Sequence, residues 1–260
     1  MNESAPQVYL LDVEGTVAPI SLVSDQLFPY ARAHFARFLE RNETNPSVTA
    51  DLTLLAQENR AEADPDAPHM APVISKKTNP VILSEAFFSG VEGPAFRGAA
   101  LAYFLWLMDH DRKSTALKSL QGKIWKAGFE SGDLKGTLFN DVSAAFKRWA
   151  AHAQVAIYSS GSIEAQRLVF RHSIFGDLTG LITAYFDTRT GPKQASASYA
   201  AIAEAMKVEP GEVLFFSDVV RELDAARAAG CQTRLVVREG NAPVEDAQGH
   251  RVIDTFVHEP

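Results

Sequence analysis

Short apolar runs separated by helical patterns recur through the second half of the chain. Residues 155–158, 213–216 and 233–237 are rich in β-branched or aromatic side chains, which is typical of strands buried on both faces of a parallel sheet. Between these runs the apolar residues recur at helical spacing, and Gly230 is a good terminator for the last of the helices. Strands that alternate with helices predict a parallel α/β sheet.

Further apolar segments extend this predicted sheet. The run at 8–11 predicts a first strand, and we expect additional strands at 181–184 and 251–253. The sheet and its helices therefore form an α/β core that comprises residues 1–18 and 137–260.

The stretch 19–136 has a different pattern. Residues 28–39 and 98–110 have helical periodicity, whereas 61–80 is rich in Ala, Pro and acidic residues and predicts a loop or a break between helices. No alternation of strand and turn occurs here. We therefore predict a helical cap domain, inserted after the first strand of the core.

Two carboxylates directly follow the first apolar run. Asp12 and Glu14 are two residues apart in the segment Asp-Val-Glu-Gly-Thr. Open parallel sheets bind ligands at the carboxyl ends of their strands. A pair of this kind can combine a nucleophile or metal ligand with a second acid–base group. A polar turn after a strand is the alternative.

Hydroxyl residues follow the strand predicted at 155–158. Ser159 and Ser160 precede a glycine and a predicted helix, where unpaired backbone N–H groups suit a phosphate. Helix capping by Ser160 or Ser162 is the alternative explanation for these hydroxyls.

A lysine and a third carboxylate complete the pattern. Lys193 follows a glycine–proline turn, and an ammonium there can neutralise a phosphate and an aspartate together, although most lysines are solvated. Asp218 follows the strand at 213–216, and Glu222 lies about one helical turn later. Such carboxylates suit Mg2+, with a helix cap as the alternative for Asp218.

Composition argues against several classes of partner. The formal net charge of -7 disfavours nucleic acid, whose phosphates require basic patches. Cys231 is the only cysteine in the sequence, so we expect no disulfide and a cytoplasmic location. No stretch approaches the roughly 18 apolar residues of a membrane span, and residues 1–7 lack a secretory signal pattern. We expect a monomer with no membrane partner.

The order of these motifs resembles the haloacid dehalogenase superfamily of aspartate-nucleophile phosphotransferases. That superfamily has a Rossmann-like α/β core, and a cap domain can be inserted after its first strand. The resemblance implies that Asp12 is the nucleophile and Glu14 the second acid of the first motif. It implies phosphate binding by Ser159 and Ser160 and makes Lys193 the lysine of the third motif. Asp218 would bind the metal, with Glu222 as the second acid of that last motif.

Further segments resemble one family of this superfamily, enolase-phosphatase E1. They are Asp-Val-Glu-Gly-Thr from residue 12, Leu-Phe-Pro-Tyr-Ala from 27, Leu-Gln-Gly-Lys-Ile-Trp from 120, Tyr-Ser-Ser-Gly-Ser from 158, Tyr-Phe-Asp-Thr from 185 and Ser-Asp-Val-Val-Arg-Glu-Leu-Asp from 217. Glu14 occupies the position at which most phosphatases of the superfamily carry Asp. Val-Ala-Pro at 17–19 replaces a hydroxyl-rich run that the family usually has after its first motif.

The family resemblance implies a Mg2+-dependent enzyme of methionine salvage. It would enolise 2,3-diketo-5-methylthiopentyl-1-phosphate, a small phosphate ester, and then remove the phosphate to give the acireductone. Asp12 would form an aspartyl-phosphate, Glu14 would act as general acid–base, and Lys193 would hold phosphoryl oxygens together with the two serines. Mg2+ would be bound by Asp12, the backbone carbonyl of Glu14 and Asp218.

Three residues of the predicted cap, Gln121, Lys123 and Trp125, are candidates for a lid over the substrate. For Trp125 we favour packing in a hydrophobic core.

Two alternative functions remain: a generic small-molecule phosphatase with the same core, and a non-catalytic phosphate-binding scaffold. Retention of the nucleophile, the lysine and the metal-binding aspartate argues against the scaffold.

Overall fold

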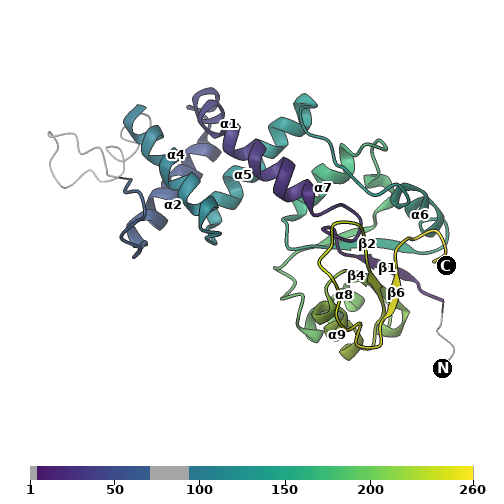
Figure 1. The fold of residues 1–260 in the computed structure, drawn as a ribbon. Coiled ribbons are helices and arrows are strands. Elements are labelled where there is room, and N and C mark those ends of the chain that lie inside the picture. The colour runs from purple at the N-terminus through teal and green to yellow at the C-terminus, as the bar shows by residue number, and fades with distance from the viewer. Residues whose placement is uncertain (1–4, 71–93, 260) are drawn as a thin grey trace. The chain divides into compact units, whose positions relative to one another are not determined.

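The computed structural model describes residues 5–70 and 94–259. The chain divides into two compact units, which we call the α/β unit and the helical unit (Figure 1). The α/β unit comprises Met1–Leu27 and Phe129–Pro260, and the helical unit comprises Phe28–Gly128. The helical unit is thus contributed by one continuous stretch that interrupts the α/β unit after its first strand.

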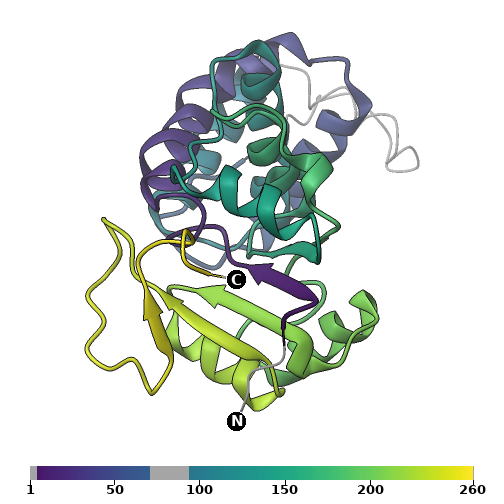
Figure 2. The ribbon, with the colours of Figure 1, turned by 90° about the vertical axis from the view of Figure 1, so that its right-hand side faces the viewer.

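The α/β unit is built on a parallel sheet, as the alternating pattern predicts. Within the described residues its strands are β1 (Val8–Leu11), β2 (Gln154–Tyr158), β3 (Ala184–Phe186), β4 (Val213–Ser217), β5 (Gln232–Val236) and β6 (Arg251–Ile253). The order across the sheet is β3-β2-β1-β4-β5-β6, and every neighbouring pair is parallel. Figure 2 shows the purple β1 alongside strands from the yellow-green C-terminal part of the chain.

The strand predicted at 181–184 is placed too early in the sequence. Thr179–Leu181 forms a 3-10 turn, and the strand in this region, β3, begins only at Ala184. Asp177 stabilises the turn, because its carboxylate accepts hydrogen bonds from the N–H and the hydroxyl of Thr179 at 2.8 and 2.6 Å.

The sheet order reverses direction at β1. The chain passes from β1 outward to β2 and β3, and then returns to the other side of β1 to form β4. Leu11 is in register with Ile157 of β2 and with Phe216 of β4, so these three strands end at the same edge. Ligands of open α/β sheets bind where the strand order reverses, which is here the carboxyl end of β1 and its neighbours.

Helices cover both faces of the sheet. They are α6 (Val142–Trp149), α7 (Ile163–Arg171), α8 (Ser196–Met206) and α9 (Val220–Ala228), with a further 3-10 turn at Pro210–Glu212. Leu10 packs in a cluster with residues of α8 and α9, whereas the Tyr9 ring stacks on Trp149 of α6 at 4.5 Å between centroids. Because successive strand residues point to opposite faces, all four residues of β1 are buried and the strand is apolar throughout.

The helical unit has a core of its own. Its helices are α1 (Phe28–Arg41), α2 (Pro46–Ala61), α4 (Pro94–Asp109) and most of α5 (Thr115–Ser131), which ends in the α/β unit. A π-helical segment of the α/β unit, Leu22–Leu27, precedes α1. The rings of Phe35 in α1 and Phe104 in α4 stack with centroids 3.8 Å apart. The helices predicted at 28–39 and 98–110 are confirmed, and 62–70 is non-helical. The remainder of the predicted break, 71–80, lies outside the described residues.

Within the described residues, no helix combines the length and the apolar character that crossing a bilayer requires.

Candidate active site

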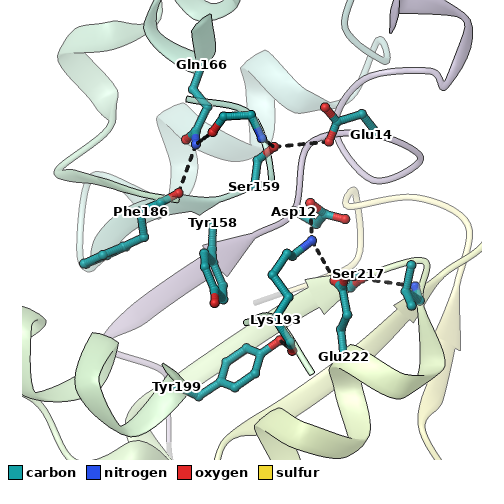
Figure 3. A network of polar contacts seen from close by, with 12 residues as sticks. Asp12, Glu14, Tyr158, Ser159, Gln166, Phe186, Lys193, Tyr199, Ser217 and Glu222 are labelled. Atoms are coloured by element: carbon teal, nitrogen blue, oxygen red, sulfur yellow. Dashed lines mark hydrogen bonds and ion pairs between the residues drawn. The ribbon is translucent and has the colours of Figure 1, made fainter. Parts of the chain in front are cut away.

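Four neighbouring strands each lead into one predicted motif. Asp12 follows β1, Ser159 follows β2, and Asp218 follows β4, while Lys193 lies in the loop between β3 and α8. The backbone N–H of Asp12 continues the sheet, because it donates a hydrogen bond to the Phe216 carbonyl at 3.0 Å. The fold therefore gathers motifs that are far apart in sequence at one edge of the sheet (Figure 3).

Lys193 bridges two carboxylates at this edge. Its Nζ lies 2.6 Å from Asp12 Oδ1 and 2.6 Å from Glu222 Oε2. Glu222 also accepts a hydrogen bond from Ser217 Oγ at 3.0 Å. Burial alone would lower the pKa of Lys193, but the charges and hydrogen bonds of Asp12 and Glu222 raise it above its ordinary value. The lysine is therefore a permanent cation that holds the Asp12 carboxylate in place.

Glu14 contacts the predicted phosphate-binding segment. Ser159 Oγ donates a hydrogen bond to Glu14 Oε2 at 3.2 Å and accepts one from the Gly161 N–H at 3.1 Å. Burial raises the pKa of Glu14, and the neighbouring charge of Asp12 raises it further. The two acids of the first motif thus have different environments: Asp12 is paired with an ammonium, and Glu14 is biased towards its protonated form, which suits a proton donor.

The Asp218 carboxylate lies against the loop that carries the first motif. Gly15 adopts a φ of 73°, and a Cβ placed on it would collide with Asp218 Oδ2. A glycine is required here both by the left-handed backbone and by the close approach of this side chain. Burial raises the pKa of Asp218 to about 7, with additional contributions from Asp12 and Glu222.

The carboxylates of this edge fit a divalent cation. Glu14, Asp218 and Glu222 each have a raised pKa, caused first by burial and then by repulsion from Asp12. A hard cation with oxygen ligands, such as Mg2+, would offset this repulsion. In the described parts of the chain, no group of three or more His, Cys, Asp or Glu side chains is arranged to hold a metal. The predicted ligand set does not require one, since it consists of two carboxylates and a backbone carbonyl.

The serines that follow β2 have different surroundings. Ser159 is buried and contacts Glu14, as described above, whereas Ser160 is exposed. Ser162 is the N-cap of α7, because its Oγ accepts a hydrogen bond from the Ala165 N–H at 3.2 Å. The capping alternative is thus correct for Ser162, and phosphate binding by Ser159 and Ser160 stays a prediction.

Two amide side chains that belong to none of the sequence motifs support the loops of the site. Asn241 Nδ2 donates to the Gly15 carbonyl at 2.9 Å and to the Val236 carbonyl at 3.3 Å. Gln166 Nε2 donates to the Gly161 carbonyl at 2.8 Å and to the Phe186 carbonyl at 2.9 Å. The signal for Gln166 is a polar residue on the buried face of a predicted helix, whereas Asn241 follows β5 in an irregular loop and gives no such signal.

The lid candidates make contacts within the helical unit. Lys123 Nζ forms an ion pair with Asp51 and donates to the Ser47 carbonyl at 3.1 Å. Trp125 packs against the core of the unit, with its ring centroid 6.1 Å from that of Phe28. The packing favoured for Trp125 is confirmed, and a lid function for these residues stays a prediction.

Comparison with known families agrees with this arrangement. The family model described as haloacid dehalogenase-like hydrolase matches residues 6–230, a range that contains every motif at this edge of the sheet. The fold and the site thus define a hydrolase of the haloacid dehalogenase-like class.

Individual proteins that are similar to this chain over nearly its whole length identify the family within this class. The chain is 49% identical to the enolase-phosphatase E1 of Synechococcus elongatus over 91% of this chain and 90% of the relative. It is 40% identical to the enolase-phosphatase E1 of Drosophila mojavensis over 99% of this chain and 96% of the relative. The crystal structure of the UTR4 protein of Saccharomyces cerevisiae matches with a TM-score of 0.73 and 33% identity, covering 97% of this chain and 99% of that one. The chain belongs to the enolase-phosphatase E1 family of the haloacid dehalogenase-like hydrolases.

Proposed function

We propose that this protein converts 2,3-diketo-5-methylthiopentyl-1-phosphate to the acireductone 1,2-dihydroxy-3-keto-5-methylthiopentene and inorganic phosphate, as a bifunctional enolase-phosphatase of methionine salvage. The observation that carries the proposal is the pair of acids after β1. Asp12 is held by Lys193 at 2.6 Å, and Glu14, two residues later, has a raised pKa and a hydrogen bond from Ser159. One acid is suited to attack phosphorus and the other to move protons.

In the phosphatase half-reaction, an Asp12 carboxylate oxygen attacks phosphorus. The new bond gives an aspartyl-phosphate while the bond from phosphorus to the ester oxygen breaks. Protonated Glu14 donates its proton to the departing oxygen. Ionised Glu14 then removes a proton from a water molecule, which attacks phosphorus and releases phosphate from Asp12. Lys193, with Ser159 and Ser160, holds the phosphoryl oxygens during both displacements.

Enolisation requires the movement of a proton from carbon to a carbonyl oxygen of the diketone. Glu14 is the candidate for this step also. Its side chain has one methylene more than that of an aspartate, so its carboxyl group extends further from the loop. The raised pKa of Glu14 brings it closer to the range in which a carboxyl group both accepts and donates a proton near neutrality.

Residues of the site also fit a metal cofactor. Asp12, Asp218 and the backbone carbonyl of Glu14 would bind Mg2+, and the repulsion among the buried carboxylates supports this assignment. When bound, Mg2+ supplies positive charge that offsets the repulsion between the attacking carboxylate and the phosphate.

Compartment and assembly are further parts of the proposal. Cys231 is the only cysteine of the sequence, and this sparse use of cysteine supports a cytoplasmic enzyme, since disulfides are rare in that reducing compartment. We propose that it acts as a monomer on a small phosphate ester. Size-exclusion chromatography with light scattering tests the monomer.

One experiment tests the proposed function. The diketone phosphate is mixed rapidly with the protein and Mg2+, and the enediol absorbance and released phosphate are followed together. Enediol phosphate should form before phosphate appears. Release of phosphate from unrelated sugar phosphates, with none from the diketone phosphate, would instead identify a generic phosphatase.

Glu14→Gln tests the assignment of the acid–base. We expect both the rate of enediol formation and the rate of phosphate release to fall at least about a hundredfold, which is the usual contribution of a positioned general acid–base. A variant that retained both rates near those of the wild type would show that Glu14 is not the proton-transfer group.

A further inference from the structure

Three hydroxyl groups bind three consecutive carbonyls of the loop that carries Lys193. Tyr158 OH donates to the Gly191 carbonyl at 2.9 Å. Ser198 Oγ donates to the Pro192 carbonyl at 2.8 Å. Tyr199 OH donates to the carbonyl of Lys193 itself at 2.7 Å. We call Tyr158, Ser198 and Tyr199 the hydroxyl clamp (Tyr158 and Tyr199 are drawn in Figure 3).

The loop requires such support because it has no regular structure of its own. Lys193 lies between β3 and α8, outside any strand or helix. Gly191 adopts a φ of 148°, and a Cβ on it would collide with Ser198 Oγ. The glycine therefore leaves the space in which Ser198 reaches the next carbonyl along the loop.

The clamp itself is attached to rigid elements. Tyr158 is the last residue of β2, and Ser198 and Tyr199 lie in the first turn of α8. The two tyrosines are completely buried, and their rings form an edge-to-face pair with centroids 5.7 Å apart. The Tyr199 ring also packs 5.0 Å from that of Phe215 in β4. The hydroxyls are thus fixed relative to the sheet.

Both phenols keep their protons. Burial raises the pKa of Tyr158 and of Tyr199, so each donates a hydrogen bond throughout the physiological pH range. The Tyr158 ring also contacts the other end of the lysine, because Lys193 Nζ lies 5.9 Å from its centroid, a distance at which a cation is attracted to an aromatic face.

We propose that Tyr158, Ser198 and Tyr199 are positioning residues that set the ammonium of Lys193 between Asp12 and Glu222. The clamp fixes the backbone from which the lysine side chain extends, and the two carboxylates then bind its end. Displacement of a reacting group by about 1 Å can cost about a hundredfold in rate. The inference rests on the proposed function, in which Lys193 holds phosphoryl oxygens.

The test compares Tyr158→Phe and Tyr199→Phe with a matched control, Tyr185→Phe. Tyr185 is the middle residue of β3, and its hydroxyl is buried without a hydrogen-bond partner in the described structure. Each clamp variant should lower kcat/KM for the phosphate ester by about tenfold, as expected for the loss of a hydrogen bond that positions the site. The control should retain the wild-type value.

Inhibition by inorganic phosphate separates positioning from folding. A displaced lysine binds phosphate more weakly, so the inhibition constant should rise about fivefold to tenfold in the clamp variants and stay unchanged in Tyr185→Phe. If either tyrosine variant fails to fold, Ser198→Ala provides the same comparison. A lower melting temperature with wild-type kcat/KM and wild-type phosphate inhibition would overturn the inference.

Failure of the inference is distinguishable from failure of the proposed function. A wild-type protein that releases no phosphate from the diketone phosphate contradicts the proposed function. A wild-type protein that is active, with clamp variants equal to the control, contradicts only the positioning role.

Discussion

Lys193 Nζ lies 2.6 Å from Asp12 Oδ1, and both side chains are buried at the carboxyl end of the central strand, with exposed fractions of 9% and 5%. This contact joins the loop after β3 to the residue after β1. In the proposed reaction, this contact neutralises the nucleophilic carboxylate and places a cation where phosphoryl charge has to be accommodated.

Lys193→Met removes this cation while keeping most of the side-chain volume. Asp12 and Glu222 are then left buried without their counterion, so we expect the free energy of unfolding to fall by about 3 kcal/mol. We also expect kcat to fall at least about a thousandfold, since a phosphate-stabilising charge is lost. Urea denaturation and steady-state kinetics measure the two effects, and an active Lys193→Met protein would contradict the role assigned to the lysine.

Gly15→Ala introduces a methyl group where Asp218 Oδ2 lies. The left-handed backbone at this position adds a strain of about 1 kcal/mol, and the Asp218 carboxylate has to move. We expect a loss of at least about tenfold in Mg2+ affinity, measured by isothermal titration calorimetry. Gly132→Ala is the matched control, because Gly132 also has a positive φ, 83°, but a Cβ there meets nothing within 4 Å. Equal Mg2+ affinities of the two variants would contradict the predicted metal site.

Asn241→Ala removes the amide that binds the Gly15 carbonyl at 2.9 Å. The loop of the first motif then loses a support that the proposed Mg2+ site requires, so we expect Mg2+ to bind about tenfold more weakly. The free energy of unfolding should fall by about 1 kcal/mol, the usual loss for one hydrogen bond. A variant with wild-type Mg2+ affinity would show that Asn241 contributes to the fold alone.

Asp141 gives the protein a pH-dependent stability. Burial acts to raise the pKa of Asp141, but hydrogen bonds from Arg238 and from the N–H of Phe256 outweigh it and lower the pKa below its ordinary value of 3.8. A depressed pKa in the folded state stabilises the protein above the ordinary pKa, and this stabilisation is lost as the pH falls through the depressed value.

Asp141→Asn tests this electrostatic contribution. At pH 7 the free energy of unfolding of the variant should be about 2 kcal/mol lower than that of the wild type. This difference should shrink as the pH falls below about 4. Asp254→Asn is the control, because Asp254 is exposed and binds Arg238 only through its backbone carbonyl, and this variant should match the wild type at every pH. A difference for Asp141→Asn that persisted unchanged into acid would contradict the mechanism.

The sheet was largely predictable because burial on both faces leaves a simple pattern. Residues of β4 are buried throughout, so the sequence there is apolar without interruption. The strand β3 was misplaced because its three residues are only partly buried and carry a weaker signal. Asp12 and Asp218 were predictable as neighbours, since both follow strands that flank the point where the sheet order reverses.

Contacts that depend on how elements pack were not predictable. Glu222 forms an ion pair with Lys193 because α9 and the loop after β3 come together at the sheet edge. No local sequence pattern predicts this contact. Tyr199 has the spacing of a core residue in α8, and its bond to the Lys193 carbonyl follows only from the packed structure. The same holds for Asn241, whose partner Gly15 is 226 residues away in sequence.

The central claim is that Asp12 is the nucleophile, and chemical trapping during turnover tests it most directly. The protein is mixed with the diketone phosphate and Mg2+, quenched, and treated with borohydride, which reduces an aspartyl-phosphate to homoserine. Mass spectrometry of the peptide that contains Asp12 should then show homoserine at position 12 and none in Asp12→Asn. An unmodified Asp12 in a protein that is turning over, or a modification at another carboxylate, would contradict the account.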